Sequence, residues 1–211
     1  MENLLFLSKE EIAKLEDPIK IIILDMDGVV NSYSLIREWL NKKFKEKKKL
    51  FSDFYEIQKE VRKEYAKEFR NMRELIFPEL AERITRICNE TGAFILWSST
   101  WRNLSEYQNL TVVRDMFKRR GLPEDRLIGY TPDLKGDQCW NFVCGVNRGE
   151  EISFWFKNYL TDRKIVGAVI DDRSDAGMGI PEFTKFFQTE KEHGITEDTT
   201  HEIISYLNKV Y

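Results

Sequence analysis

The sequence has little histidine or cysteine, which narrows the chemistry that it can perform. Only His193 and His201 are present, so neither a histidine-based zinc site nor a Ser-His-Asp triad is expected. The three cysteines, Cys88, Cys139 and Cys144, have no Cys-x-x-Cys spacing and cannot all pair. We expect them to be reduced and mostly buried thiols in a cytoplasmic protein. Catalysis would then have to use carboxylates, hydroxyls and cations.

Long apolar runs and stretches rich in glycine or proline are also missing. No stretch approaches the roughly 18 apolar residues that span a bilayer, so we expect no membrane partner. The first ten residues lack the basic start and the apolar run of a secretion signal. Hydrophobic residues make up 42% of the chain, which excludes a disordered or collagen-like protein. The 211 residues favour a single domain over 1–211, with room for a modest insertion.

Positive charge is concentrated in one segment, although the net charge of the whole chain is only −3. Residues 37–73 contain 13 Lys and Arg against 7 Asp and Glu, whereas the rest contains 20 against 29. The segment has no Gly or Pro, and its apolar residues recur every three or four positions from Phe51 to Phe69, which predicts amphipathic helix. Its lysines at 42–49 form either a solvated helix face or a surface that attracts an anionic substrate.

Short apolar runs followed by polar residues predict the strands. Three runs are strong, at 19–24, 93–97 and 164–170, and two are weaker, at 126–130 and 185–188. Helical patterns lie between them, at 78–89, 104–119, 150–160 and 197–209. This alternation predicts an α/β fold, a Rossmann-like parallel sheet flanked by helices. The basic segment is predicted to be a small helical cap, inserted after the first strand at 34–75 and lying over the edge of the sheet.

The three strong strands are each followed by polar side chains. These are Asp25 and Asp27, Ser98 and Ser99, and Asp171 and Asp172. Ligands bind at the carboxyl ends of the strands in an open α/β sheet, so we expect the six residues on one rim. Gly28 would permit the tight turn that brings the first two carboxylates to one site. The sequence Asp-x-Asp-Gly by itself is also typical of an ordinary turn. The polar residues at the ends of the other two strands favour a functional site over that interpretation.

The order and spacing of these motifs resemble the haloacid dehalogenase (HAD) superfamily of phosphotransferases, across about 19–211 apart from the insertion. The first, second and fourth motifs are matched by Leu24-Asp-Met-Asp-Gly-Val-Val30, Phe94-Ile-Leu-Trp-Ser-Ser-Thr100 and Val169-Ile-Asp-Asp-Arg-Ser-Asp175. The third motif is a Lys or Arg that opens the helix before the last of these strands. Arg148 matches it best, while the rivals Lys157 and Lys164 lie within a predicted helix and at a strand start.

Finer features are similar to HAD domains of bacterial and phage proteins, one branch of which is associated with predicted RNA-repair proteins. The matching stretches are 27–31, 98–102, 129–132, 148–152 and 194–198. The association concerns genomic context and does not identify a substrate.

The resemblance implies Mg²⁺-dependent hydrolysis of a phosphomonoester through an aspartyl phosphate. Asp25 would attack phosphorus, and Asp27 would protonate the leaving oxygen and then deprotonate water. Asp25, the backbone carbonyl of Asp27, and Asp171 or Asp172 would hold Mg²⁺, with Asp172 favoured as the direct ligand. Because Asp27 provides the acid that phosphatases need, dehalogenase chemistry is disfavoured, and a mutase is an alternative that would use the same site.

The resemblance also assigns roles to a hydroxyl and to cations. Ser98 or Ser99 would donate a hydrogen bond to a phosphoryl oxygen, and Ser98 is favoured. Arg148 would neutralise charge and restrain the nucleophile. Arg102 is interpreted equally well as a contact to a substrate phosphate or as a surface arginine beside Trp101.

The expected substrate is a small phosphorylated metabolite or a nucleotide. A polynucleotide 3′-phosphate is the alternative, motivated by the basic segment and the finer resemblance. An alternative of another class is a non-catalytic module that binds phosphorylated ligands or nucleic acid. No feature of the sequence indicates an oligomeric state.

Overall fold

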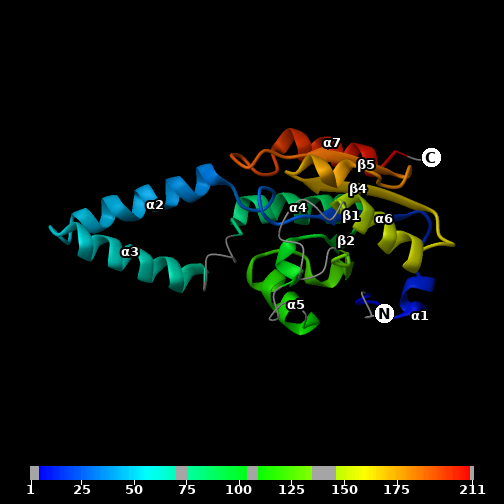
Figure 1. Ribbon diagram of the computed structural model, residues 1–211, viewed down its shortest axis with the longest axis horizontal. Helices are drawn as coiled ribbons and strands as arrows, with labels where there is room; N and C mark the ends of the chain where they lie inside the picture. Colours follow the sequence, from blue (N-terminus) through cyan, green and yellow to red (C-terminus); the bar gives the residue numbers. More distant parts are fainter. Residues whose placement is uncertain (1–4, 70–75, 104–108, 135–145, 210–211) are drawn as a thin grey trace.

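The computed structural model describes residues 5–69, 76–103, 109–134 and 146–209. Its centre is a five-stranded parallel sheet with the strand order β3-β2-β1-β4-β5 (Figure 1). The strands are β1 Ile19–Leu24, β2 Phe94–Trp97, β3 Leu127–Tyr130, β4 Ile165–Asp171 and β5 Thr184–Gln188. The α/β class and all five predicted strands are confirmed.

Strand β1 lies at the centre of the sheet and is buried on both faces. Ile21, Ile22 and Ile23 are fully buried, because β1 pairs with β2 on one side and with β4 along its whole length on the other. The chain continues from β1 toward β2 and β3, and the later strands β4 and β5 add on the opposite side. The carboxyl ends of β1 and β4 therefore flank a topological switch point, where ligands bind in open α/β sheets.

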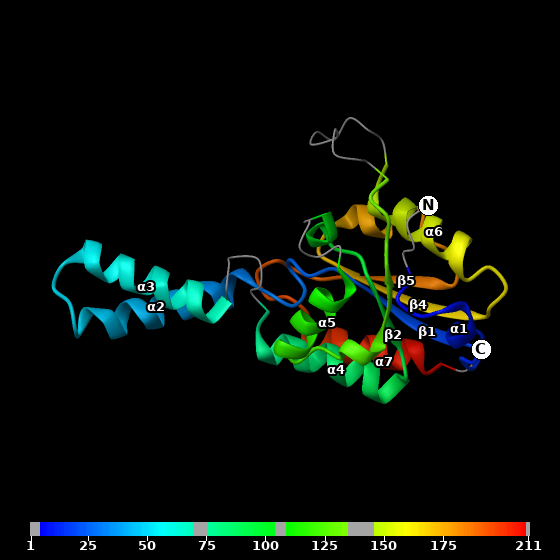
Figure 2. The same cartoon turned by 90° about the horizontal axis from the view of Figure 1, so that it is seen from below.

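Helices cover both faces of the sheet (Figure 2). Helices α4 Pro78–Thr91, α5 Leu110–Arg119 and α7 Glu197–Leu207 contribute to the core cluster that contains Ile22 and Leu24. Helices α1 Lys9–Ala13 and α6 Arg148–Tyr159 contribute to the cluster that contains Ile21 and Ile23. Successive β1 side chains thus enter opposite cores, as the two-residue period of a strand requires.

The predicted helices are confirmed wherever the structure describes them. The first part of the predicted helix 104–119 lies outside the described residues, and α5 begins at Leu110. Short 3₁₀ helices follow β2 at η1 Thr100–Asn103, precede β3 at η3 Glu124–Arg126 and follow β4 at η5 Ser174–Gly177. Cys88 is buried as expected, whereas Cys139 and Cys144 lie outside the described residues. No described helix has the length and apolar character needed to cross a membrane.

The insertion after β1 is a helical hairpin, which we call the arm. It consists of α2 Tyr33–Lys48 and α3 Phe54–Phe69 and extends away from the body of the molecule (Figures 1 and 2). The two helices bury Ile57 and Val61 and pair Trp39 with Tyr65 at 5.4 Å between ring centroids. The predicted helical insertion after β1 is confirmed, but its described helices extend outward from the sheet edge and do not lie over it (Figure 1). Leu35, Ile36, Trp39 and Tyr65 pack against the core of the body. The predicted end of the insertion, 70–75, lies outside the described residues.

Gly149 lies in the first turn of α6, where that helix approaches η5 closely. A Cβ on this residue would lie 1.9 Å from the carbonyl oxygen of Met178. We expect Gly149→Ala to lower the free energy of unfolding by about 1–3 kcal/mol in urea denaturation, since the helix would have to shift. Lys157→Ala, on the exposed side of the same helix, should change it by less than about 0.5 kcal/mol. Equal effects of the two variants would contradict the close approach.

Candidate active site at the carboxyl edge of the sheet

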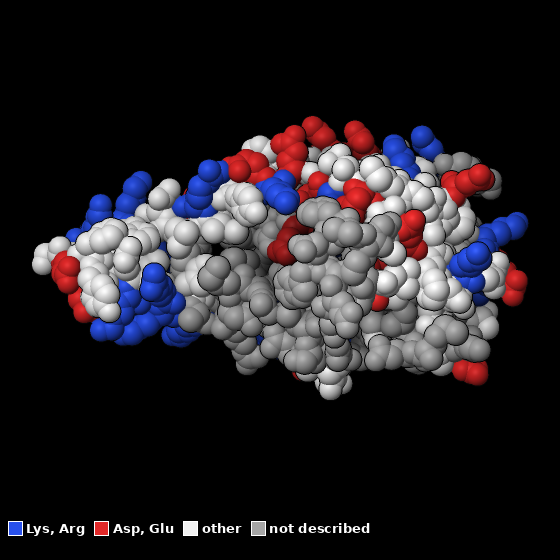
Figure 3. All heavy atoms as spheres, viewed as in Figure 1, with Lys and Arg blue, Asp and Glu red and all other residues white. Residues whose placement is uncertain are grey.

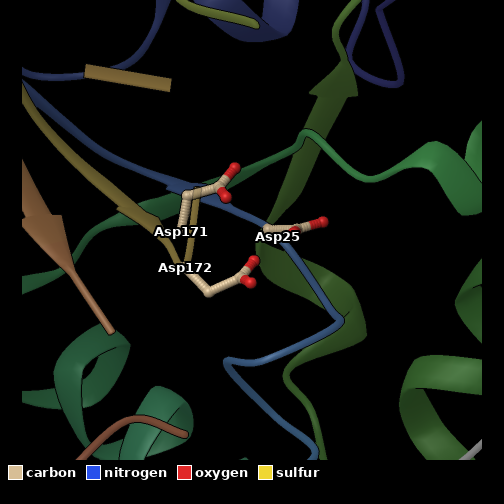
Figure 4. Close-up of side chains that lie close together, drawn as sticks. All are labelled: Asp25, Asp171 and Asp172. Atoms are coloured by element: carbon tan, nitrogen blue, oxygen red, sulfur yellow. The ribbon is translucent and has the colours of Figure 1, made fainter. Parts of the chain in front are cut away.

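Three carboxylates meet where β1 and β4 end. Asp25 directly follows β1, Asp171 is the last residue of β4, and Asp172 comes next. The paired register of the two strands puts Leu24 beside Ile170, so the residues that follow them are neighbours. One carboxylate oxygen from each residue lies within 4.8 Å of those of the other two (Figure 4). Asp25 and Asp171 are almost completely buried.

Arg148 extends into this cluster from the start of α6. Its Nη1 lies 2.9 Å from Asp25 Oδ1 and 2.9 Å from Asp171 Oδ2, and it donates to the backbone oxygen of Ser98 at 2.5 Å. Helix α6 begins at Arg148, as predicted, because the side chain of Asn147 caps it in a capping box. One guanidinium thus links the ends of β1, β2 and β4.

The charges of the cluster act strongly on one another because water is largely excluded. Burial raises the pKa of Asp171 to about 7; Arg148 opposes the rise and the Asp25 charge adds to it. Burial and the Asp25 charge also raise the pKa of Asp172. Burial by itself would lower the pKa of Arg148, but the two neighbouring carboxylates outweigh it and raise that pKa above its ordinary value.

The cluster fits a hard divalent cation such as Mg²⁺. It offers three carboxylates against two cations, Arg148 and Lys191, and oxygen is the ligand atom that Mg²⁺ prefers. Two of its buried oxygens, Asp25 Oδ1 and Asp172 Oδ2, have no aligned hydrogen bond to a described residue. Their contacts are ionic only, at 2.9 Å to Arg148 and at 3.3 Å to the Lys191 ammonium. These oxygens could therefore turn toward a metal without losing a hydrogen bond.

Asp27 lies beside the cluster but its carboxylate does not belong to it. The residue is exposed, and one oxygen accepts a hydrogen bond from Trp101 Nε1 at 2.9 Å. The other accepts from Asn31 Nδ2 at 2.8 Å, and the amide oxygen of Asn31 accepts from the Gly28 N–H at 2.8 Å. Two donors therefore orient this carboxylate. Sequence reasoning assigned no role to Trp101 or to Asn31.

The two serines after β2 are both buried beside the cluster. The Ser98 N–H donates to the backbone oxygen of Leu24 at 2.8 Å, and its hydroxyl accepts from Thr131 Oγ1 at 3.2 Å. The hydroxyl of Ser99 accepts from the N–H of Trp101 at 3.4 Å. The preference for Ser98 as the phosphate-binding hydroxyl stays a prediction.

Arg102 is buried, so its interpretation as a surface arginine is wrong. Its Nη2 lies 2.6 Å from Glu151 Oε2, and its Nη1 donates to the Ser99 backbone oxygen at 2.7 Å. Burial lowers the pKa of Arg102 and raises that of Glu151, so each charge depends on the other. The pair ties η1 to α6. Contact of Arg102 with a substrate stays a prediction.

The segment after β5 closes over the first motif. Thr189 Oγ1 donates to the Gly28 backbone oxygen at 2.7 Å, and the Ile195 N–H donates to the Val29 backbone oxygen at 2.9 Å. Lys191, which sequence reasoning did not single out, lies between them along the chain and reaches Asp172. Residues near 190 thus position the turn that carries Asp27.

The family model described as the HAD domain in Swiss Army Knife RNA repair proteins matches residues 21–200. The chain belongs to this family. The match includes β1, β4, Arg148 and the arm, and it confirms the resemblance to the HAD superfamily and to its RNA-repair branch. This HAD domain is of the phosphatase kind, and its acidic cluster is compatible with that activity. No curated protein and no solved structure matches the chain.

Binding of Mg²⁺ should depend on pH because a proton on Asp171 removes negative charge from the cluster that attracts the cation. The pKa of this group rises from 3.8 to about 7 on folding, so the folded chain binds more protons between these values. Without a cation, this group makes the protein less stable as the pH rises through that window. We expect the increase in melting temperature on adding Mg²⁺ to be larger at pH 7.5 than at about pH 5.5.

Differential scanning fluorimetry would measure the effect. Asp172→Asn should reduce it at every pH, whereas Asp115→Asn, on the exposed side of α5, should leave it unchanged. A shift of the same size at both pH values would contradict a cation site at this cluster.

Proposed function

We propose that this HAD domain hydrolyses phosphomonoesters with Mg²⁺, through an aspartyl phosphate on Asp25. The observation that carries the proposal is the pairing of a buried and restrained carboxylate, Asp25, with an exposed and oriented one, Asp27, two residues later. A site for binding alone would not need a second carboxylate held in this way. Phosphoryl transfer needs both a nucleophile and a proton donor.

In the first step, a carboxylate oxygen of Asp25 attacks phosphorus and the bond to the ester oxygen breaks. Protonated Asp27 gives its proton to the leaving alkoxide, so an alcohol departs. In the second step, Asp27 takes a proton from water, which attacks the same phosphorus. Inorganic phosphate leaves, and Asp25 is regenerated as a carboxylate. The hydrogen bonds from Trp101 and Asn31 hold Asp27 in the orientation that both proton transfers need.

Arg148 restrains the nucleophile and balances charge. It contacts Asp25 through Oδ1, which leaves Oδ2 for the attack. Asp25, the Asp27 carbonyl and Asp172 would hold Mg²⁺, which when bound neutralises the phosphoryl oxygens. Asp172 is favoured over Asp171 because both oxygens of Asp171 already accept hydrogen bonds, from Arg148 and from the Arg173 N–H at 2.8 Å.

Ser98 is the favoured donor to a phosphoryl oxygen, with Ser99 as the alternative. Both hydroxyls are buried at the end of β2, which runs beside β1. A hydroxyl there would stabilise charge that develops on the transferred group. Arg102 would act on the substrate only through its effect on Ser99, whose backbone oxygen it already binds.

Two observations favour a polynucleotide end over a small phosphorylated metabolite or free nucleotide as the substrate. The family is described by its occurrence in RNA repair proteins. The described helices of the arm extend outward, whereas a cap that encloses a small substrate would lie across the sheet edge (Figure 1). A panel of sugar phosphates, nucleotides and 3′-phosphorylated oligonucleotides would rank these classes directly.

Replacement of the nucleophile should abolish the activity. We expect Asp25→Asn to lower the rate of hydrolysis of a generic aryl phosphate by at least about 10³-fold, because an amide cannot form the covalent intermediate. Asp162→Asn, an exposed position between α6 and β4, should retain wild-type activity. Equal activity of the wild type and Asp25→Asn would disprove the proposed enzymatic activity. A wild type inactive on the whole panel would favour the non-catalytic binding module.

Loss of the indole donor to Asp27 should lower turnover. Trp101→Phe keeps an aromatic ring in a buried position but removes the hydrogen bond to a charged group, which is worth about 1.5–3 kcal/mol. We expect kcat to fall about 10–100-fold, because Asp27 would no longer be held in the orientation that proton transfer needs. KM should change little.

Trp155→Phe is the matched control, because the Nε1 of this buried tryptophan has no hydrogen-bond partner among the described residues. This variant should lose stability and keep kcat within about twofold. An equal fall in kcat in the two variants would make Trp101 a packing residue only.

A further inference from the structure

The ion pairs of the arm neutralise some of its cations and leave others without a described partner. Lys43 and Lys47 of α2 both reach Glu64 of α3, the first at 3.1 Å. On α3, Lys59 and Lys63 pair with acids one turn earlier, at 3.5 Å and 2.5 Å. Most acidic side chains of the arm therefore form ion pairs within the arm itself. The cations between 42 and 62 that pair with no described residue are Lys42, Lys45, Lys48, Lys49 and Arg62.

Three of these lysines form a stripe on the outer face of α2. Lys42, Lys45 and Lys49 are spaced three and four positions apart, so they share one side of the helix. They line an open hollow of about 670 Å³, together with Ser34, Arg37, Glu38, Asn41 and Glu46. Glu46 is 3.6 Å from Lys43, which leaves Glu38 as the unpaired acid of the stripe. Basic side chains stand along the arm in Figure 3.

The helix that carries the stripe begins beside the active site. The backbone N–H groups of Tyr33 and Ser34 donate to the backbone oxygens of Lys191 and Glu192, at 2.9 Å and 3.2 Å. Arg37 forms an ion pair with Glu192. Because Lys191 also contacts Asp172, the base of α2 is held next to the carboxylate cluster. From there the 16 residues of α2 extend for about 24 Å.

The far end of the arm exposes large apolar side chains. Leu50, Phe51, Phe54 and Tyr55 are 72%, 36%, 59% and 69% exposed. Aromatic rings beside lysines are the combination that binds single-stranded nucleic acids, because bases stack on the rings while cations track the phosphates.

We propose that the outer face of α2 and this aromatic end bind a single nucleic-acid strand whose terminal phosphate lies at the carboxylate cluster. The inference rests on the proposed phosphatase function and assigns the strand-binding surface to the arm. A repeating polyanion complements a stripe of cations on the helix whose base lies at the catalytic edge. A membrane surface would use the apolar end and would need no link between this helix and the site.

The test combines Lys42→Glu, Lys45→Glu and Lys49→Glu in the full chain. The matched control reverses the same number of charges at Lys157, Lys164 and Lys209, which are exposed and lie in helix ends and a strand start away from the arm. Hydrolysis of an aryl phosphate and of a 3′-phosphorylated ten-nucleotide RNA would be measured, together with RNA binding by fluorescence anisotropy at several salt concentrations.

We expect the arm variant to lose about tenfold or more in kcat/KM on the RNA and to keep aryl phosphate hydrolysis within about twofold. RNA binding by this variant should also depend less on salt, because three phosphate contacts are removed. The slope of log affinity against log salt concentration should become less negative by about two. An equal loss in the control variant would overturn the proposal, because general charge would then explain it.

Further outcomes separate the two proposals. A wild type that hydrolyses aryl phosphate but neither binds nor cleaves the RNA would overturn the role of the arm and leave the phosphatase intact. A wild type that hydrolyses no phosphoester, yet binds RNA through these lysines, would overturn the phosphatase and support the surface. Binding to phosphatidylserine vesicles that is lost in the arm variant, with RNA hydrolysis unchanged, would assign the arm to membranes and overturn the proposal.

Discussion

The interaction on which the rest of the structure depends is the contact of one guanidinium with two buried carboxylates. Asp25 and Asp171 stand side by side because β1 and β4 pair in register, and two buried negative charges repel each other strongly. Arg148 offsets that repulsion only if α6 begins at the right place. The cap at Asn147 and the close approach of Gly149 to η5 provide this placement. The start of α6 therefore has two roles, one in the packing of the helix and one in the candidate active site.

A second set of contacts separates the two carboxylates of the first motif into different environments. Asp25 is buried against a cation, whereas Asp27 is exposed and held by an indole and an amide. This difference suits a nucleophile and a proton donor, which need opposite protonation states in the same step. The turn between 189 and 195 binds the backbone of Gly28 and Val29, carries Lys191 to Asp172 and anchors α2. The base of the arm and the carboxylate cluster are therefore connected through one short segment.

The sequence was sufficient to predict the fold class, the strands and the meeting of polar residues at one edge. Each of these rests on local patterns, such as apolar runs ended by Asp or Ser, and on the general geometry of parallel sheets. Contacts between distant residues could not be read from such patterns. Asp27 and Trp101 are 74 positions apart, and Arg102 and Glu151 are 49 apart. Trp101 and Arg102 both follow β2, where the sequence fitted Arg102 equally well as a substrate contact or as a surface cation and assigned no role to Trp101.

The arm shows most clearly which structural features local sequence patterns can predict and which they cannot. Its composition determined that it is helical and basic, since charge and apolar periodicity are properties of the chain itself. Which lysines remain unpaired was decided by the packing of α2 on α3, because Glu64 faces Lys43 and Lys47 only after the hairpin closes. The direction of the arm was decided by its anchorage at residues 191 and 192, a contact made across more than 150 positions. The sequence by itself thus determined the chemistry of the site, and the tertiary structure decided how that chemistry is oriented toward a substrate.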